Sequence, residues 1–264
     1  MDYKIAYREI VNFLREETEC VDGVILGLSG GIDSALVAYI AVDALGKERV
    51  KTQGLPYGEQ NTRDGDKIAE ILGTEHINID IKPRVDSLIK TFESLDGKKL
   101  EELVNGKLVH GNLRARERMC CLYTQANRDN LMVLGTTNKS EYEIGYFTKH
   151  GDGAADLELI QDLYKTEVWE LAKYRNLPKW IIKKAPSAEL WEGQTDEREI
   201  GVPYKILDQI LKGEIEGIDP EKVKIIKRRV LAAAHKKNPP KYPKLRYFLD
   251  NLHPPIPDIT LEYK

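Results

Sequence analysis

The 264-residue sequence has only three cysteines, Cys20, Cys120 and Cys121, and none of them forms a Cys-X-X-Cys pair. No histidine stands at ligand spacing from a cysteine, so neither a zinc site nor a disulfide framework is indicated. Cys120 and Cys121 are adjacent and would point to different sides of a helix. We expect all three cysteines to have a packing role.

Long apolar runs are also missing from the sequence. No stretch approaches the roughly 20 apolar residues that span a bilayer, and the charged N-terminus MDYKIAYREI has no signal-peptide core. These absences predict a cytoplasmic location and no membrane partner. A net charge of −3 argues against broad nucleic-acid binding, which needs a basic surface.

Apolar runs and amphipathic segments alternate along the first half of the chain. Four runs have the composition of buried strands and are separated by helical patterns: GVILGLS, VKTQGLP, EHINIDI and LMVLGTT. This order predicts an α/β fold with a doubly wound, mostly parallel sheet and helices on both faces. We expect residues 95–110 to form a surface excursion, residues 112–130 a long helix and the glycine-rich residues 146–160 a functional loop.

The first strand is followed directly by Ser29-Gly30-Gly31-Ile32-Asp33-Ser34 and then by a helical pattern. A strand, a glycine-rich turn and a helix start form an anion site, because their backbone N–H groups point to one spot. The two serines add hydroxyl donors. Asp33 would repel a phosphate unless a cation such as Mg²⁺ lies between them. The sequence therefore favours phosphate binding, with a structural turn capped by Ser or Asp as the alternative.

Other phosphate-binding motifs do not fit this turn. A Walker A loop needs GxxxxGK[ST], and no lysine follows here; the dinucleotide fingerprint GxGxxG is absent as well. The SGGxDS pattern instead resembles the loop of ATP pyrophosphatases, which cleave ATP to AMP and pyrophosphate. Later segments resemble the NAD synthetase family in its order: LPYGEQ (55–60), GNLRARERM (111–119), GTTNKSE (135–141), GYFTKHGDGAAD (145–156), DLYKTEVWELA (162–172) and HKK (235–237).

The resemblance implies a Rossmann-like ATP-pyrophosphatase fold in one domain over 1–264. It would comprise an N-terminal helix in 1–20, a nucleotide-binding core in 21–176 and a helical part in 177–264. The implied reaction is the amidation of deamido-NAD⁺ by ammonia, driven by ATP and Mg²⁺ through an adenylated intermediate, to give NAD⁺, AMP and pyrophosphate. No amidase pattern accompanies the synthetase segments, so ammonia rather than glutamine is the expected nitrogen donor.

The resemblance also implies roles for particular residues. ATP contacts would come from Gly27, Leu28, Ser29, Gly30, Gly31, Ile32, Asp33, Ser34, Gln60, Thr136, Lys165 and Ser187. Asp33 and Glu141 would bind Mg²⁺. Deamido-NAD⁺ would be bound by Arg116, Lys149, Asp156, His235 and Lys236. Asp152 is a candidate general base, and Gly54 is a departure, because the family often has a basic residue there.

The family's members are homodimers, so the resemblance implies a homodimer here too. The sequence offers two apolar faces for it, on the N-terminal helix and on the helix near 112–129. Two other functions stay open at this stage. A tRNA-modifying ATP pyrophosphatase would need a basic RNA surface and often catalytic cysteines, and a non-catalytic nucleotide-binding module would give Glu141, Lys165 and the glycine-rich loop no purpose.

Overall fold

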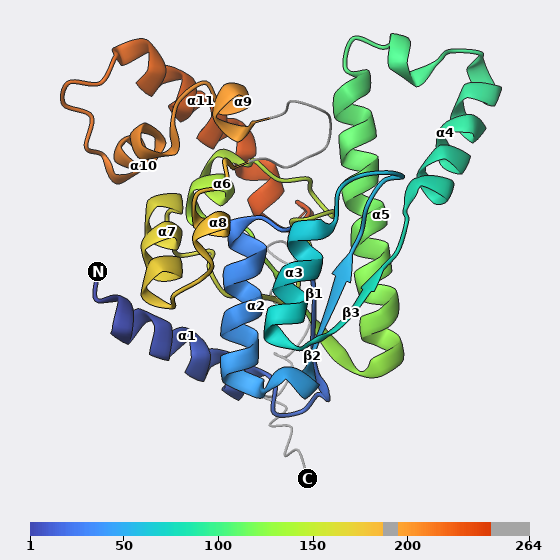
Figure 1. The fold of residues 1–264 in the computed structure, drawn as a ribbon. Coiled ribbons are helices and arrows are strands. Elements are labelled where there is room, and N and C mark those ends of the chain that lie inside the picture. Colours follow the sequence, from blue (N-terminus) through green and yellow to red (C-terminus); the bar gives the residue numbers. More distant parts are fainter. Residues whose placement is uncertain (187–194, 244–264) are drawn as a thin grey trace, which may run out of the picture.

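The computed structural model describes residues 1–186 and 195–243, and Figure 1 shows a parallel sheet with helices on both sides. The five strands lie in the order β3-β2-β1-β4-β5, and every neighbouring pair is parallel. The predicted doubly wound α/β fold is therefore confirmed. The strands are β1 (Gly23–Gly27), β2 (Val50–Gly54), β3 (Glu75–Asn78), β4 (Leu131–Gly135) and β5 (Leu157–Glu158).

Helices occupy most of the remaining described chain. No helix among the described residues is long and apolar enough to cross a bilayer. The helices are α1 (Tyr3–Glu17), α2 (Ile32–Leu45), η1 (Lys47–Arg49), α3 (Arg63–Leu72), α4 (Lys82–Asp96), η2 (Leu100–Glu102), α5 (Gly106–Asp129), α6 (Lys139–Ile144), α7 (Lys165–Tyr174), α8 (Lys179–Ile182), α9 (Asp196–Ile200), α10 (Tyr204–Lys212) and α11 (Pro220–Lys237).

The central strand β1 is apolar on both faces because helices cover both. Val24 and Leu26 belong to the main core, which also contains buried residues of α1, α2 and α7. Ile25, between them, points to the other face and packs with Val133 of β4 and Ala126 of α5. Side chains alternate across a strand, so this continuous apolar run fills two cores at once, as parallel strands require.

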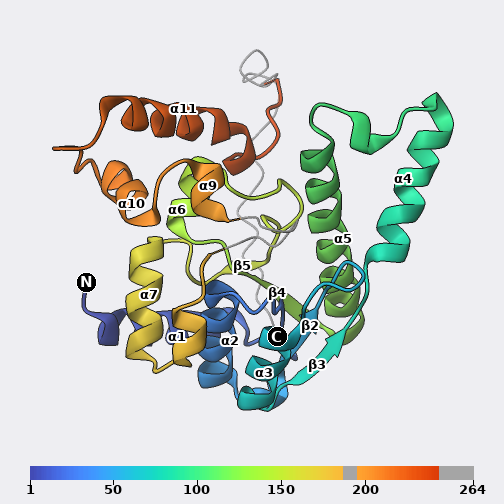
Figure 2. The same ribbon diagram turned by 45° about the horizontal axis from the view of Figure 1, so that its top comes forward.

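A second, smaller core lies beside the sheet, where α6, α10 and α11 pack together (Figure 2). Tyr204, Leu207 and Ile226 are fully buried in it. The predicted helical part over 177–264 therefore contributes to two cores, because Ile181 of α8 packs in the main one. Residues 244–264 of that part lie outside the described residues.

Two local expectations differ from the structure. α5 begins at Gly106, so the predicted surface excursion already contains the first turn of the long helix. Glycines lower helix propensity by only about 1 kcal/mol each, and packing can outweigh that cost. The expected packing role holds for Cys121, which is buried, but is wrong for Cys20 and Cys120, which are exposed.

Candidate active site

The glycine-rich turn joins the end of β1 to the start of α2. Gly31 caps α2, and Gly30 has a φ of 77°, a left-handed conformation that favours glycine. A Cβ at Gly30 would lie 2.6 Å from Cβ of Asp64, so the close approach of α3 also demands glycine. The Ser29 hydroxyl lies 3.1 Å from that of Ser34 and accepts a hydrogen bond from the Gly31 N–H at 3.2 Å.

The turn lies where the winding of the sheet reverses. From β1 the chain builds outward through β2 and β3, whereas β4 and β5 lie on the opposite side of β1. Ligands of open α/β sheets bind at the carboxyl ends of the strands at such a switch point. The segments that follow β1 and β4, at Leu28 and Thr136, both lie there and both line one cavity.

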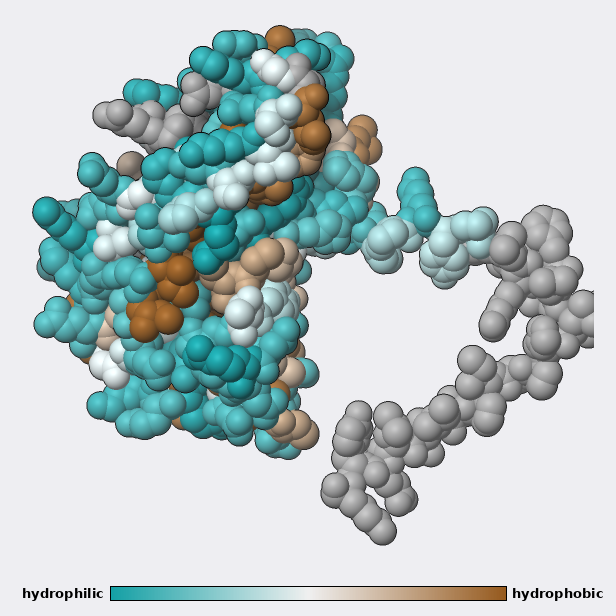
Figure 3. Space-filling view, turned by 90° about the vertical axis from the view of Figure 1, so that its right-hand side faces the viewer, coloured by the Kyte–Doolittle hydropathy of each residue, from teal (hydrophilic) through white to brown (hydrophobic). Residues whose placement is uncertain are grey.

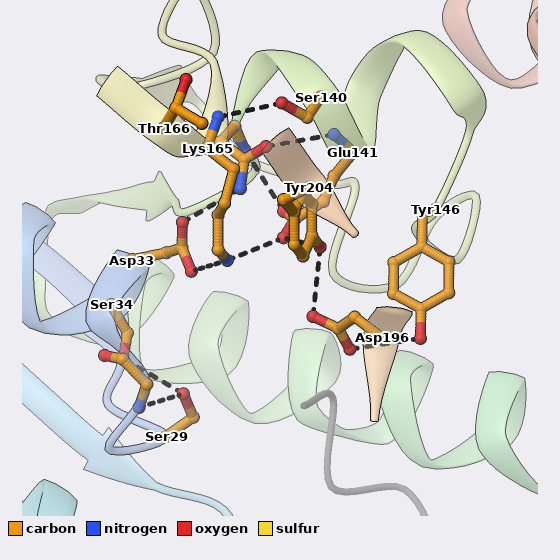
Figure 4. A network of polar contacts seen from close by, with 12 residues as sticks. Ser29, Asp33, Ser34, Ser140, Glu141, Tyr146, Lys165, Thr166, Asp196 and Tyr204 are labelled. Carbon is orange, nitrogen blue, oxygen red and sulfur yellow. Dashed lines mark hydrogen bonds and ion pairs between the residues drawn. The ribbon is translucent and has the colours of Figure 1, made fainter. Parts of the chain in front are cut away.

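Three charged side chains meet beside the turn (Figure 4). Nζ of Lys165, at the start of α7, lies 2.6 Å from Oδ2 of Asp33 and 3.2 Å from Oε1 of Glu141. The Lys165 side chain is only 2% exposed, against 17% and 15% for the carboxylates. The structure thus brings together three predicted residues, of which the first and the last, Asp33 and Lys165, are 132 positions apart in the sequence.

Burial and pairing act in opposite directions on these groups. Burial raises the pKa of Glu141 to about 7, although the ammonium of Lys165 favours its charged form. Burial opposes the charge of Lys165, but Asp33 and Glu141 outweigh it and raise the pKa of its ammonium. Lys165 therefore stays protonated, as a buried cation should when carboxylates surround it.

Asn138 ties the end of β4 to the turn. Its Oδ1 accepts the Glu141 N–H at 3.1 Å as the N-cap of α6, and Glu141 Oε2 in turn accepts the Asn138 N–H at 3.4 Å. Nδ2 of Asn138 donates to Oδ1 of Asp33 at 3.0 Å. Asn138 thus contacts both predicted metal-binding carboxylates, Asp33 through its side-chain amide and Glu141 through its backbone N–H. The spacing Asn-x-x-Glu is a capping-box pattern and could have indicated this residue from the sequence.

A second layer of polar groups surrounds Glu141. The hydroxyl of Tyr204 lies 3.1 Å from carboxylate oxygens of both Glu141 and Asp196, and its one proton can be donated to either. The hydroxyl of Tyr146 lies 3.2 Å from Asp196 and 2.6 Å from Glu199. Burial raises the pKa of Asp196 and, more strongly, that of Tyr204. Sequence analysis missed these four residues, because Tyr146 and Tyr204 give no local signal that they face carboxylates.

The cavity at this edge has a volume of about 410 Å³, within the range of small-molecule sites. Several predicted ATP residues line it together with Asp152 and Lys236. The predicted residues that line the cavity are Gly27, Leu28, Ser29, Gly31, Ile32, Asp33, Ser34, Gln60, Thr136, Glu141, Asp152, Lys165 and Lys236. Of the two other predicted ATP contacts, Gly30 is not among the residues that line the cavity, and Ser187 lies outside the described residues.

The other residues predicted for deamido-NAD⁺ are not among those that line this cavity. Three of them form a chain from α5 to α11: Arg116 donates to the Lys149 carbonyl at 3.4 Å, and Nζ of Lys149 donates to the His235 carbonyl at 2.8 Å. Asp156 instead accepts the Val133 N–H at 2.8 Å and the Tyr123 hydroxyl at 3.1 Å. These contacts fasten the glycine-rich loop to β4 and α5.

Gln60 and Gly54 lie at the β2 side of the cavity. Oε1 of Gln60 accepts from the Tyr57 N–H at 3.1 Å and from Arg118 at 3.0 Å. A side chain at Gly54 would overlap the amide of Asn78. The space that a basic residue would need there is therefore already filled by Asn78.

The donor set fits a magnesium ion. Asp33 and Glu141 both face the Lys165 ammonium, so a single cation can reach both carboxylates. Among the described residues no three Asp, Glu, His or Cys side chains are gathered as a metal cage. Mg²⁺ is commonly held by one or two carboxylates together with substrate phosphates and water, so two carboxylates next to the glycine-rich turn match the protein's share of such a site.

The sequence of this chain is similar to those of proteins from one known family. The NAD synthase family model matches residues 6–240. An NH(3)-dependent NAD(+) synthetase of Pyrococcus horikoshii is 49% identical over 213 residues, which cover 80% of this chain and 78% of that protein. One from Methanosarcina acetivorans is 41% identical over 262 residues, which cover 93% of this chain and 100% of that protein.

Solved structures agree with the sequence comparisons. An NMN synthetase from Francisella tularensis has a TM-score of 0.83 and 36% identity, covering 92% of this chain and 99% of the other. An NH3-dependent NAD synthetase from Campylobacter jejuni has a TM-score of 0.75 and 34% identity, covering 92% of this chain and 100% of the other.

Proposed function

This chain belongs to the NAD synthase family, and on that premise we propose that it is an ammonia-dependent NAD⁺ synthetase. The reaction joins ammonia to the nicotinate carboxylate of deamido-NAD⁺ and converts ATP to AMP and pyrophosphate. The observation that carries the proposal is the meeting of Asp33, Glu141 and Lys165 beside the phosphate-binding turn, inside a cavity at the switch point of the sheet. An RNA-modifying enzyme or a non-catalytic module would not belong to this family.

The chemistry requires activation of a carboxylate, because an amine cannot expel oxide from it at neutral pH. The nicotinate carboxylate attacks the α-phosphorus of ATP, pyrophosphate leaves, and ammonia then displaces AMP from the adenylated carboxyl group. Positioning and charge neutralisation supply most of the rate enhancement in such transfers. The site offers both without a protein nucleophile.

We assign the ATP side of the reaction to the turn and its neighbours. Backbone N–H groups of Gly30 and Gly31 and the hydroxyls of Ser29 and Ser34 would hold the phosphates. Lys165 would contribute its buried positive charge at the same place. When bound, Mg²⁺ supplies the charge neutralisation that lets phosphates approach a carboxylate, and Asp33 and Glu141 are the residues that would hold it.

For the other substrates we assign Arg116, Lys149, Asp156, His235 and Lys236 to deamido-NAD⁺. Arg116, Lys149 and His235 come from α5, the glycine-rich loop and α11, which the Lys149 contacts already join. Asp152 lines the cavity and accepts the Thr148 N–H at 2.9 Å. We propose that its carboxylate takes the proton that ammonium must lose before it attacks.

We further propose that the protein is a homodimer and that the face of α4 and the start of α5 forms its interface. Figure 3 shows this side of the molecule, where hydrophobic patches interrupt a hydrophilic surface. The exposed apolar side chains there are Leu88, Phe92, Leu95, Leu103, Val104 and Leu108. They lie N-terminal to the segment 112–129 from which a dimer face was expected. Clustered exposed apolar groups commonly mark association surfaces.

The deciding experiment measures NAD⁺, AMP and pyrophosphate formed from ATP, Mg²⁺ and deamido-NAD⁺, with ammonium or glutamine as nitrogen source. We expect equal amounts of the three products with ammonium and little turnover with glutamine. Asp33→Asn should lower kcat/KM for ATP by about 10²–10³-fold through loss of a charged group at the phosphates. Asp162→Asn is the matched control, because Asp162 is 95% exposed.

The similarity to the Francisella tularensis NMN synthetase favours one second candidate, amidation of nicotinate mononucleotide. The chemistry at the carboxyl group would be the same, but the substrate would lack the adenylate half. Running the assay with both substrates separates the two functions. A higher kcat/KM for nicotinate mononucleotide would replace the first proposal, and absence of any amide product with either substrate would contradict both.

A further inference from the structure

The phosphate-binding turn contains no lysine, so positive charge must reach it from elsewhere in the fold. Four cationic side chains among the described residues line the cavity: Arg118, Lys165, Lys184 and Lys236. Arg118 donates to the Leu55 carbonyl and to Gln60. Lys236 donates to the carbonyls of Gly145 and Phe147, at 2.7 Å and 2.6 Å. Both point to parts of the cavity other than the turn.

Lys184 is the cation in this group that contacts the backbone of the turn. Its Nζ donates to the Gly30 carbonyl at 3.2 Å and lies 2.9 Å from Oδ2 of Asp64. The lysine follows α8, whose fully buried Ile181 anchors that short helix in the main core. Asp64 lies in the first turn of α3, which touches Gly30 itself. Two packed elements therefore hold one ammonium group next to the turn.

The positive charge of Lys165 is already paired beside the turn. Its ammonium is shared by Asp33 and Glu141. Lys165 is also almost fully buried, whereas the side chain of Lys184 is 29% exposed to the cavity and solvent. Lys184 is the more accessible of these two lysines and is placed where a ligand can reach it.

We propose that Lys184 is a catalytic residue that binds the pyrophosphate leaving group, and that Asp64 is the positioning residue that holds its ammonium beside Gly30. The inference rests on the proposed synthetase function. In the adenylation step, a nicotinate carboxylate oxygen forms a bond to the α-phosphorus while the bond from that phosphorus to the α–β bridging oxygen breaks. The electron pair stays on pyrophosphate, and Lys184 remains protonated and donates to its oxygens.

The test compares kcat and KM for ATP, together with inhibition by added pyrophosphate, in wild-type protein and Lys184→Met. The methionine retains the apolar stem but removes the charge. We expect kcat/KM for ATP to fall about 10–100-fold, as for the loss of a charge-assisted hydrogen bond. The inhibition constant for pyrophosphate should rise by a similar factor, while KM for deamido-NAD⁺ stays unchanged. Lys184→Arg should restore part of the pyrophosphate affinity.

Two controls separate this role from a structural one. Lys183 is the exposed neighbour, and Lys183→Ala should behave as wild type. Asp64→Asn keeps the shape beside Gly30 but removes the carboxylate that positions the ammonium, so pyrophosphate should inhibit this variant about two- to fivefold less strongly. A structural role predicts instead that Lys184→Arg restores no pyrophosphate affinity and that KM for deamido-NAD⁺ rises in both Lys184→Met and Asp64→Asn, and that result would overturn the inference.

If wild-type protein makes NAD⁺, and Lys184→Met is equally active and equally inhibited by pyrophosphate, the inference is also overturned. If wild-type protein makes no amide product at all, the proposed function fails first. Thermal unfolding of Lys184→Met keeps the comparison interpretable, because a midpoint close to the wild-type value assigns the lost activity to the missing charge. If the methionine protein unfolds early, Lys184→Gln provides the same comparison, because it also removes the charge.

Discussion

The carboxylates of this molecule differ in the hydrogen-bond donors and charges that surround them. Asp33 is held between an ammonium and an amide N–H. Glu158, at the end of β5, instead accepts the Thr137 N–H at 3.2 Å. Burial, with Glu141 and Asp152 nearby, raises the pKa of Glu158 to about 8. We therefore expect this residue to make folding stability depend on pH.

The expected dependence follows from proton binding. The folded state keeps the Glu158 proton up to about pH 8, whereas the unfolded chain releases it near 4.5, the ordinary pKa of a glutamate. The folded state thus binds more protons between these pH values, and this group's contribution to stability falls as pH rises through the window. Glu158→Gln removes the titration. Relative to wild type, the variant should gain stability from pH 5 to pH 8, with a slope of at most about 1.4 kcal/mol per pH unit.

Urea unfolding at pH 5, 6.5 and 8 measures this gain, and the exposed Glu216→Gln is the matched control. Glu216→Gln should keep the wild-type pH dependence. Parallel stability curves for wild type and Glu158→Gln would mean that Glu158 is ionised in the folded protein at pH 5.

At the scale of elements, the position of α3 depends on one glycine in its first turn. A Cβ at Gly65 would overlap the carbonyl oxygen of Leu28, where β1 runs into the phosphate-binding turn. The overlap is with backbone, so it cannot be relieved by turning a side chain. α3 can approach the turn, and bring Asp64 next to Gly30, only because residue 65 has no side chain.

Gly65→Ala should therefore move α3 away from the turn. We expect a loss of about 1–3 kcal/mol in unfolding free energy, which is typical of overpacking, together with weaker ATP binding by calorimetry. Glu70→Ala, on the exposed side of the same helix, should leave ATP affinity unchanged. Equal ATP affinity in wild type and Gly65→Ala would show that the turn does not depend on contact with α3.

At the scale of the whole molecule, the proposed dimer face is the feature most open to a direct test. Phe92 and Leu95 of α4 are 60% and 74% exposed. Replacing both, as Phe92→Glu with Leu95→Lys, should convert a dimer to a monomer in sedimentation velocity, because charges would have to be buried at the interface. Phe13→Glu on α1, at a residue 41% exposed, tests the other candidate face. Dissociation by Phe13→Glu alone would move the interface to α1.

The sequence by itself determined the order of the first four strands and the position of the turn after β1. The strands of 23–27 and 131–135 are short continuous apolar runs, and burial on both faces of a parallel sheet produces that pattern locally. SGGIDS is contiguous as well, so its strand, turn and helix start could be recognised together. Glu141 and Lys165 were identified through resemblance, and the structure places them with Asp33 at one point.

Only the tertiary structure decided which distant side chains complete the site. Tyr204 reaches Glu141 across 63 positions, and Lys184 reaches Gly30 across 154. Such contacts leave no periodic signal, because periodicity reports which face of an element is buried and not which polar group it meets. Packing also decided that α5 starts at Gly106 and that Asn78 fills the space beside Gly54. Both outcomes depend on neighbouring elements that local sequence does not specify.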